Sequence, residues 1–254
     1  MSLKLTPPAF LAANPFFRRL FLLRKLYLSK TWGIHYSQFG EDETIRRRFP
    51  KGMCGFYVDV GCFHPKKYNN TWRLYKSGWR GINIDIDAIK IEAFNIARPE
   101  DTNIACGVSS ETGEVEYYSH GFFSVTTTLD RTFTENKSNY QTRKTNTETL
   151  TTLIDRTPYK NRTIDFLSID CEGHDIEVLK SLDIERYAPA LIAIELHAKL
   201  FTEVETSEIY EYLLDKGYCL TGWAGFTLMF AGPSLQKTLA KPSPDLTDEQ
   251  TPNR

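Results

Sequence analysis

The sequence predicts an α/β fold with a mostly parallel sheet and helices on both of its faces. Short apolar runs of strand length alternate along the chain with helical patterns, and this alternation is typical of a parallel sheet. Most of the runs end in an acidic residue or a glycine turn. Near the end of the chain, two further runs joined by Ala224-Gly225 predict an antiparallel hairpin that closes one edge of the sheet.

Five apolar runs predict the parallel strands, at Phe56–Val60, Gly81–Asp85, Asn103–Cys106, Phe166–Asp170 and Leu191–Glu195. Helical spacing predicts helices at Ala88–Arg98, Ile176–Leu182 and Ser207–Lys216, and the hairpin follows at 218–223 and 226–230. We expect Thr206 to cap the last of these helices and Gly217 to end it.

Composition narrows the class of protein. The 254 residues are 41% hydrophobic and 25% charged, which is typical of a globular protein with one large domain. A net charge of -1 argues against nonspecific nucleic-acid binding, and we expect no nucleic-acid partner. The five cysteines are odd in number and form no C-x-x-C pair, so we expect a reducing, cytoplasmic setting.

The first 34 residues form a separate basic arm in this interpretation. Between Phe16 and Leu28, apolar and basic residues alternate at helical spacing, and charges interrupt the run before the roughly 18 apolar residues that a spanning helix needs. Such an amphipathic helix lies on an anionic membrane surface or an acidic partner, or packs on its own domain with its basic side chains extended to water. The first alternative places the protein at the inner face of a membrane.

Two other segments stand outside the alternation. Residues 119–163 are rich in Thr, Ser and Asn, which predicts an inserted loop, lid or edge strand over a substrate cleft, or a solvated excursion. Residues 236–254 contain Pro242, Pro244 and Pro252 among polar residues and are predicted to be disordered. The main domain then spans residues 35–235.

Candidate ligand-binding residues stand at strand ends, where open parallel sheets bind ligands. Asp59 and Gly61 end the first strand, and Asp85 ends the second, from where a carboxylate can bind both hydroxyls of a ribose. The first loop lacks the glycines of G-x-G-x-x-G, so an adenosine without a pyrophosphate fits better than NAD. Taken singly, either acid could instead cap a turn.

Four stretches resemble the FkbM-type S-adenosylmethionine-dependent methyltransferases: Ser37–Asp42, Tyr57–Gly61, Gly81–Asp85 and Ile164–Glu177. The run Asp170-Cys171-Glu172-Gly173-His174-Asp175 is the most specific of them. The resemblance spans residues 35–232 and implies a Rossmann-like class I methyltransferase fold with a seven-stranded sheet. The chain departs from the family pattern at Cys62-Phe63-His64-Pro65, where small residues and glycine are more usual.

The resemblance also implies residue roles. Asp59 and Gly61 would line the methionine and sulfonium end of S-adenosylmethionine, and Asp85 would hold the ribose. The remaining cofactor-binding candidates border the same pocket: Gln38, Glu41, Cys106, Gly107 and Asp170.

A second cluster follows the strands at 166–170 and 191–195, and it comprises Asp170, Glu172, Glu195 and His197. Adjacent parallel strands lie about 4.8 Å apart, so these side chains can converge. Methyl transfer to a hydroxyl needs a base or a divalent ion. We expect Glu172 to be the base, with His197 as the alternative, and similarity to related methyltransferases implies Mg²⁺ on Asp170, Glu195 and His197. His174 and Asp175 are expected to be N-terminal helix residues without a catalytic role.

The expected activity is O-methylation of a sugar hydroxyl in a bacterial surface glycan or its precursor, as the resemblance implies. A polyketide or peptide hydroxyl is the competing acceptor. An NAD-linked or nucleotide-sugar oxidoreductase and a catalytically silent binding module remain as other classes. Aromatic residues that could offer ring faces to a sugar, or belong to the core, are Trp72, Trp79, Phe122, Phe123 and Trp223.

Overall fold

The computed structural model describes residues 14–17, 20, 35–119, 124, 127–129 and 140–240. Contacts divide the chain into two units, Met1–Ile34 and His35–Arg254. Most of the predicted basic arm lies outside the described residues, although 15–17 are helical. None of the described helices is long and apolar enough to cross a membrane.

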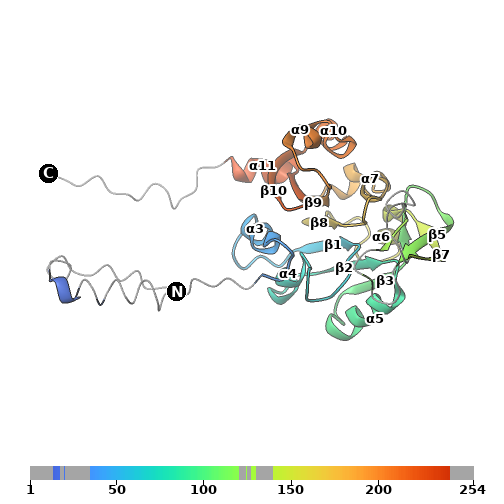
Figure 1. Cartoon of the computed structure of the whole chain (residues 1–254), viewed down its shortest axis with the longest axis horizontal. Helices are drawn as coiled ribbons and strands as arrows, with labels where there is room; N and C mark the ends of the chain where they lie inside the picture. Colours follow the sequence, from blue (N-terminus) through green and yellow to red (C-terminus); the bar gives the residue numbers. More distant parts are fainter. Residues whose placement is uncertain are drawn as a thin grey trace. The chain divides into compact units, whose positions relative to one another are not determined.

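The second unit is built on a seven-stranded sheet in the order β10-β11-β9-β8-β1-β2-β3 (Figure 1). Pairing is parallel from β9 through β8, β1 and β2 to β3, whereas β11 runs antiparallel to both β9 and β10. The predicted fold class, with its C-terminal hairpin, is confirmed. The strands are β1 (Phe56–Val60), β2 (Arg80–Asp85), β3 (Thr102–Ala105), β8 (Phe166–Ile169), β9 (Leu191–Glu195), β10 (Cys219–Ala224) and β11 (Thr227–Ala231).

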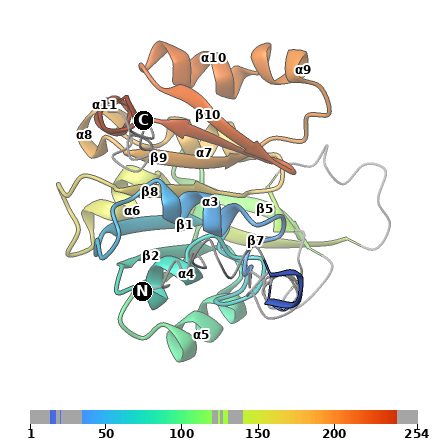
Figure 2. The same ribbon diagram turned by 90° about the vertical axis from the view of Figure 1, so that its left-hand side faces the viewer.

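Helices cover both faces of this sheet (Figure 2). One face carries a core shared by α6, α7, α8 and α10, and the other packs against α3, α4 and α11. All five residues of β1 are buried, which explains why this strand is apolar except for Asp59. The helices are α3 (Glu41–Arg47), α4 (Trp72–Lys76), α5 (Ala88–Ala97), α6 (Leu150–Asp155), α7 (Asp175–Lys180), α8 (Ile184–Tyr187), α9 (Phe201–Glu205), α10 (Glu208–Asp215) and α11 (Pro233–Leu239).

Strand order fixes where a ligand can enter. The chain moves outward from β1 through β2 to β3, and then returns to place β8 on the other side of β1. The carboxyl ends of β1 and β8 therefore flank the point where the order of the strands reverses, and this is where open α/β sheets bind ligands.

A second sheet, in the order β4-β7-β5-β6, lies partly within the predicted insertion at 119–163, because β6 and β7 belong to the insertion while β4 and all but the last residue of β5 precede it. Its strands are β4 (Gly107–Val108), β5 (Gly113–Ser119), β6 (Thr127–Thr128) and β7 (Gln141–Glu148). The described part of 119–163 thus differs from a loop, because β7 pairs with β5 along seven residues and α6 buries Leu150, Leu153 and Ile154. Residues 120–123, 125–126 and 130–139 of the segment lie outside the described residues.

Residues 236–239 of the predicted tail belong to α11, and residues 241–254 lie outside the described part of the chain.

Helix α10 begins one residue later than predicted. The Ser207 hydroxyl accepts a hydrogen bond from the backbone N–H of Tyr210 at 3.2 Å, so Ser207 rather than Thr206 is the N-cap. Thr206 instead follows the last residue of α9 and donates its hydroxyl to the Thr202 carbonyl of that helix. Two adjacent hydroxyl residues therefore belong to two different helices.

This difference predicts unequal effects of two neighbouring substitutions. Ser207→Ala is expected to lower the free energy of unfolding by about 1 kcal/mol, because it removes an N-cap. Thr206→Ala, the matched control, is expected to stay within about 0.5 kcal/mol of wild type. Urea denaturation measures both, and an equal loss in the two variants would contradict the assignment of the cap.

Candidate functional site

A cavity of about 210 Å³ opens at the carboxyl ends of β1, β2 and β8. Segments of β6, β9 and the hairpin also reach it. It brings together nine residues named from the sequence: Gln38, Glu41, Gly61, Asp85, Cys106, Gly107, Asp170, Glu172 and Glu195. Asp59 and His197 are absent from its lining as described.

Gly61 joins the ends of β1 and β8. Its φ of +73° lies in the left-handed region, and its N–H donates to the carbonyl of Ile84 at 2.9 Å. A Cβ atom here would lie 1.7 Å from the backbone oxygen of Asp170. Glycine is therefore required by the close approach of the Asp170 backbone, in addition to any ligand contact.

Asp59 lies beneath the loop that follows β1. Its carboxylate accepts hydrogen bonds from the Thr71 hydroxyl at 2.7 Å and from the Asn69 amide at 3.1 Å, and the residue is 4% exposed. The buried guanidinium of Arg98 donates to the side chains of the same two residues. The geometry thus differs from the expectation that Asp59 lines the methionine end, and gives it the role of holding the loop after β1.

Asp85 lines the cavity at the end of β2. It lies beside Lys90, a residue that was not predicted from the sequence. The Oδ2 atom of Asp85 accepts from the Phe63 N–H at 3.0 Å and from the Lys90 ammonium at 3.3 Å. Its Oδ1 atom accepts from the Asp87 N–H at 2.9 Å. Burial raises the pKa of Asp85 above its ordinary value, and Lys90 opposes that rise.

A tight loop presents Glu172 to the cavity. The Asp175 carboxylate accepts from the backbone N–H groups of Cys171 at 2.9 Å and Gly173 at 3.1 Å. Glu172 itself has a φ of 52°, which is an uncommon conformation for a residue with a side chain. Its carbonyl accepts from the Thr128 hydroxyl of β6 at 2.8 Å. Strain of this kind is typical of functional sites, and Asp175 has a loop-forming role beyond that of a helix-terminal acid.

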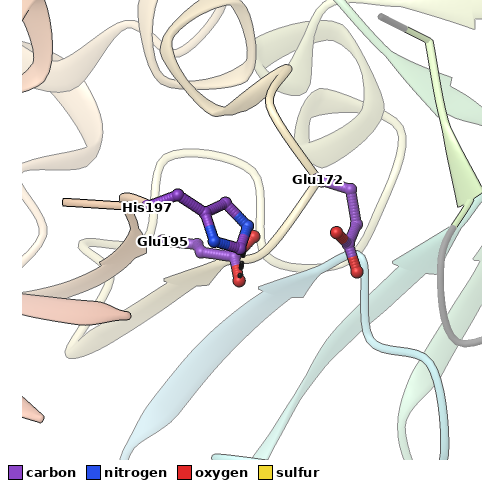
Figure 3. A group of neighbouring side chains, drawn as sticks. All are labelled: Glu172, Glu195 and His197. Atoms are coloured by element: carbon purple, nitrogen blue, oxygen red, sulfur yellow. Dashed lines mark ion pairs between the residues drawn. The ribbon is translucent and has the colours of Figure 1, made fainter. Parts of the chain in front are cut away.

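Glu172, Glu195 and His197 form a possible metal site. One ligand atom from each lies within 4.8 Å of the others, and Figure 3 shows the three side chains gathered around one space. Glu195 Oε1 lies 3.5 Å from His197 Nε2, while the buried Oε2 atom of Glu195 has no hydrogen-bond partner among the described residues. The predicted donor set contained Asp170, whereas the geometry groups Glu172 with the other two.

Confined negative charge dominates this end of the cavity. Burial and the neighbouring carboxylates of Asp170 and Asp175 raise the pKa of Glu195. Burial, with the charge of Asp170, raises the pKa of Asp175 to about 7. Burial, with the charges of Asp59 and Glu41, raises the pKa of Asp170 to about 6, while a hydrogen bond with Glu195 lowers it. Carboxylates crowded together favour a bound cation or shared protons, and perturbed pKa values of this kind cluster at functional sites.

The aromatic residues named from the sequence lie elsewhere. Trp79 is 2% exposed in the core, Trp72 stacks on Tyr75 at 5.5 Å, and neither they nor Trp223 lines the cavity. Phe122 and Phe123 lie outside the described residues. Among the described residues, the Phe and Tyr side chains that line the cavity are Phe39, Phe63, Tyr68 and Phe226.

Phe39 and Phe226, which both line the cavity, pack edge to face with their ring centroids 5.9 Å apart. They are far apart in sequence, so only the fold brings them together.

The family model described as "Methyltransferase FkbM domain" matches residues 59–220. No curated protein matches the sequence.

Two solved structures are similar to this chain. One is a TehB-like SAM-dependent methyltransferase from Corynebacterium glutamicum ATCC 13032 Kitasato, with 15% identity and a TM-score of 0.41, covering 86% of this chain and 100% of that one. The other is Methyltransferase FkbM from Methylobacillus flagellatus KT, with 16% identity and a TM-score of 0.44, covering 81% of this chain and 46% of that one.

Proposed function

Because the chain belongs to the FkbM methyltransferase family, we propose that it uses S-adenosylmethionine to methylate a sugar hydroxyl of a bacterial surface glycan or its precursor. The observation that carries this proposal is the cavity between β1, β2 and β8, which has a hydrogen-bonding carboxylate at one end and an acidic cluster at the other. The ribose hydroxyls of a nucleoside would suit the first end of the cavity, and a positively charged group attached to that nucleoside would suit the second.

The residues present fit S-adenosylmethionine. Asp85 offers a buried acceptor for a ribose hydroxyl, and Cys106 and Gly107 follow β3 beside it. Asp170 and Glu195 place two carboxyl groups near the position expected for the sulfonium, whose positive charge would favour their ionised forms. When bound, S-adenosylmethionine supplies a methyl group on a positively charged sulfur.

Glu172 is the proposed general base. Its side chain lines the cavity, and the loop closed by Asp175 holds its backbone in place. There its carboxylate accepts the proton that the acceptor hydroxyl releases, and this is the usual contribution of a positioned base. His197, near Glu195, is the alternative base.

Calorimetry tests the cofactor. We expect S-adenosylmethionine and S-adenosylhomocysteine to bind with micromolar Kd values, and NAD and UDP-sugars to give no heat of binding. Turnover of sugar precursors, beside polyketide and peptide hydroxyls, then tests the acceptor. Binding of NAD or a UDP-sugar in place of the methionine nucleotides would overturn the proposal.

A divalent cation is the alternative to a carboxylate base, and with a cation bound Glu172 and His197 would be ligands rather than bases. Glu172, Glu195 and His197 provide two carboxylates and an imidazole, and the unpartnered Oε2 atom of Glu195 suits a cation. Such a cation lowers the pKa of a coordinated hydroxyl. Magnesium was the expected ion, but an imidazole in the donor set favours Mn²⁺ over Mg²⁺.

Thermal melting of EDTA-treated protein measures the preference for the ion. Mn²⁺ at 100 times its Kd is expected to stabilise the fold by about 2.7 kcal/mol, and Mg²⁺ at the same concentration by less. Glu195→Gln should abolish the shift, whereas Glu205→Gln, on the exposed side of α9, should keep it. An unchanged melting temperature with every divalent ion would remove the cation from the mechanism.

The basic arm supplies a third proposal, a peripheral contact with the anionic inner face of the cytoplasmic membrane. The six Lys and Arg residues within 1–34 support it, since each basic residue near an anionic surface adds about 1 kcal/mol. Deletion of residues 1–30 is expected to abolish co-sedimentation with phosphatidylglycerol vesicles but leave S-adenosylhomocysteine binding intact. Equal sedimentation of both proteins would reject the membrane role.

A further inference from the structure

Lys90 is an unusual residue in its position, because lysine is almost never fully buried without a partner. It lies on α5, five residues beyond Asp85, and is 3% exposed. Its ammonium lines the cofactor cavity, 3.3 Å from Asp85 Oδ2 and 3.4 Å from the Thr127 hydroxyl of β6. The ring of Phe63 lies 5.4 Å from the same ammonium.

The hydrogen-bonding capacity of Asp85 is already largely used. Each carboxylate oxygen accepts about two hydrogen bonds. Oδ2 has two donors among the described residues, Phe63 N–H and Lys90, whereas Oδ1 has only the Asp87 N–H. One acceptor position on Oδ1 remains. Asp85 as it stands can therefore accept from one ribose hydroxyl, and a grip on both hydroxyls needs a second group.

Lys90 can supply the hydrogen-bond donor that this second group needs. An ammonium carries three N–H donors, and two of them reach Asp85 and Thr127, the acceptors that the described residues provide. The third donor is left for a ligand in the cavity. A hydroxyl oxygen accepts as readily as its O–H donates, so a diol can donate to Asp85 and accept from Lys90.

We infer that Lys90 and Asp85 together form the ribose-binding group, with Asp85 Oδ1 accepting from one hydroxyl and the Lys90 ammonium donating to the other. This inference rests on the proposed use of S-adenosylmethionine and adds a specificity residue to it. The charge of Lys90 also opposes the rise that burial causes in the pKa of Asp85. The contact with Thr127 links this end of the cavity to the second sheet.

The test compares S-adenosylhomocysteine with its 2′-deoxy and 3′-deoxy analogues by calorimetry, on wild type and Lys90→Met. Wild type is expected to bind each deoxy analogue roughly tenfold more weakly than S-adenosylhomocysteine, because each analogue lacks one hydrogen bond to a charged group. In Lys90→Met, one analogue is expected to bind as tightly as S-adenosylhomocysteine itself, while the other keeps its penalty. A purely structural role of Lys90 would leave both penalties unchanged.

Control variants keep the test decisive. Lys144→Met removes an exposed lysine that pairs with Glu114 and should reproduce wild type. If Lys90→Met does not fold, Lys90→Gln retains an N–H donor without the charge and should keep part of the penalty. Absence of S-adenosylhomocysteine binding to wild type refutes the proposed function. If Lys90→Met binds S-adenosylhomocysteine and keeps both analogue penalties, the inference is refuted but the proposed function is not. The same holds if Lys90→Gln shows both penalties as large as those of wild type.

Discussion

Glu172→Gln is expected to lower kcat by about 10²–10⁴-fold, the contribution of a positioned general base, and to leave the Kd of S-adenosylhomocysteine within twofold of wild type. Glutamine has nearly the same shape but does not take up a proton at neutral pH. The loop geometry is expected to persist, because Asp175 holds it through the backbone of Cys171 and Gly173. Single-turnover methylation and calorimetry on the same preparation measure the two quantities.

Glu205→Gln is the matched control, since Glu205 is exposed on α9 and does not line the cavity. A parallel loss of binding and turnover in Glu172→Gln would show that Glu172 supports the cofactor rather than the proton transfer. If Glu172→Gln turned over at the wild-type rate, His197→Gln becomes the variant to measure.

Gly61→Ala is expected to lower the free energy of unfolding by about 2–5 kcal/mol, the sum of left-handed backbone strain and steric overlap. The added Cβ atom would lie 1.7 Å from the Asp170 oxygen, so the ends of β1 and β8 must separate. Since the cavity lies between those ends, S-adenosylhomocysteine binding should be lost as well. Urea denaturation and calorimetry measure the two effects.

The Gly52→Ala control separates the cost of left-handed backbone strain from the cost of steric overlap. Gly52 has a φ of +84°, close to the +73° of Gly61, yet nothing lies within 4 Å of its Cβ position. The control is expected to lose only about 1–2 kcal/mol and to bind S-adenosylhomocysteine normally. Equal destabilisation of the two variants would show that backbone strain alone accounts for Gly61.

The sheet could be predicted from the sequence because its strands are buried on both faces. Val58, Ile82 and Leu167 belong to short, mostly apolar runs of strand length, and even the polar residues inside these runs are buried. The strands β5 and β7 could not be predicted in the same way, since most of their residues are exposed or only partly buried and β7 is polar throughout. Their stability comes from pairing with each other rather than from an apolar pattern.

Much of the site could be predicted because the carboxyl ends of neighbouring parallel strands lie at the same edge of a sheet. Gly61, Asp85 and Asp170 were predicted on this basis to lie close together, and they do line one cavity. Asp59 does not line this cavity: its neighbour on the strand, Val60, lines it, whereas the Asp59 carboxylate accepts from Thr71. Lys90 was missed because a single lysine in a helix is usually solvated.

The pairing of β1 with β8 has a consequence for how the protein is made. The Phe56 N–H binds the Asp165 carboxylate across 109 residues of chain, and β1 is the strand on which the cavity depends. A nascent chain that has released β1 to β3 from the ribosome holds half a sheet with an unpaired central edge. Closing such long loops is slow and leaves apolar surface exposed meanwhile. S-adenosylmethionine is therefore not expected to assist folding until β8 has emerged and paired with β1.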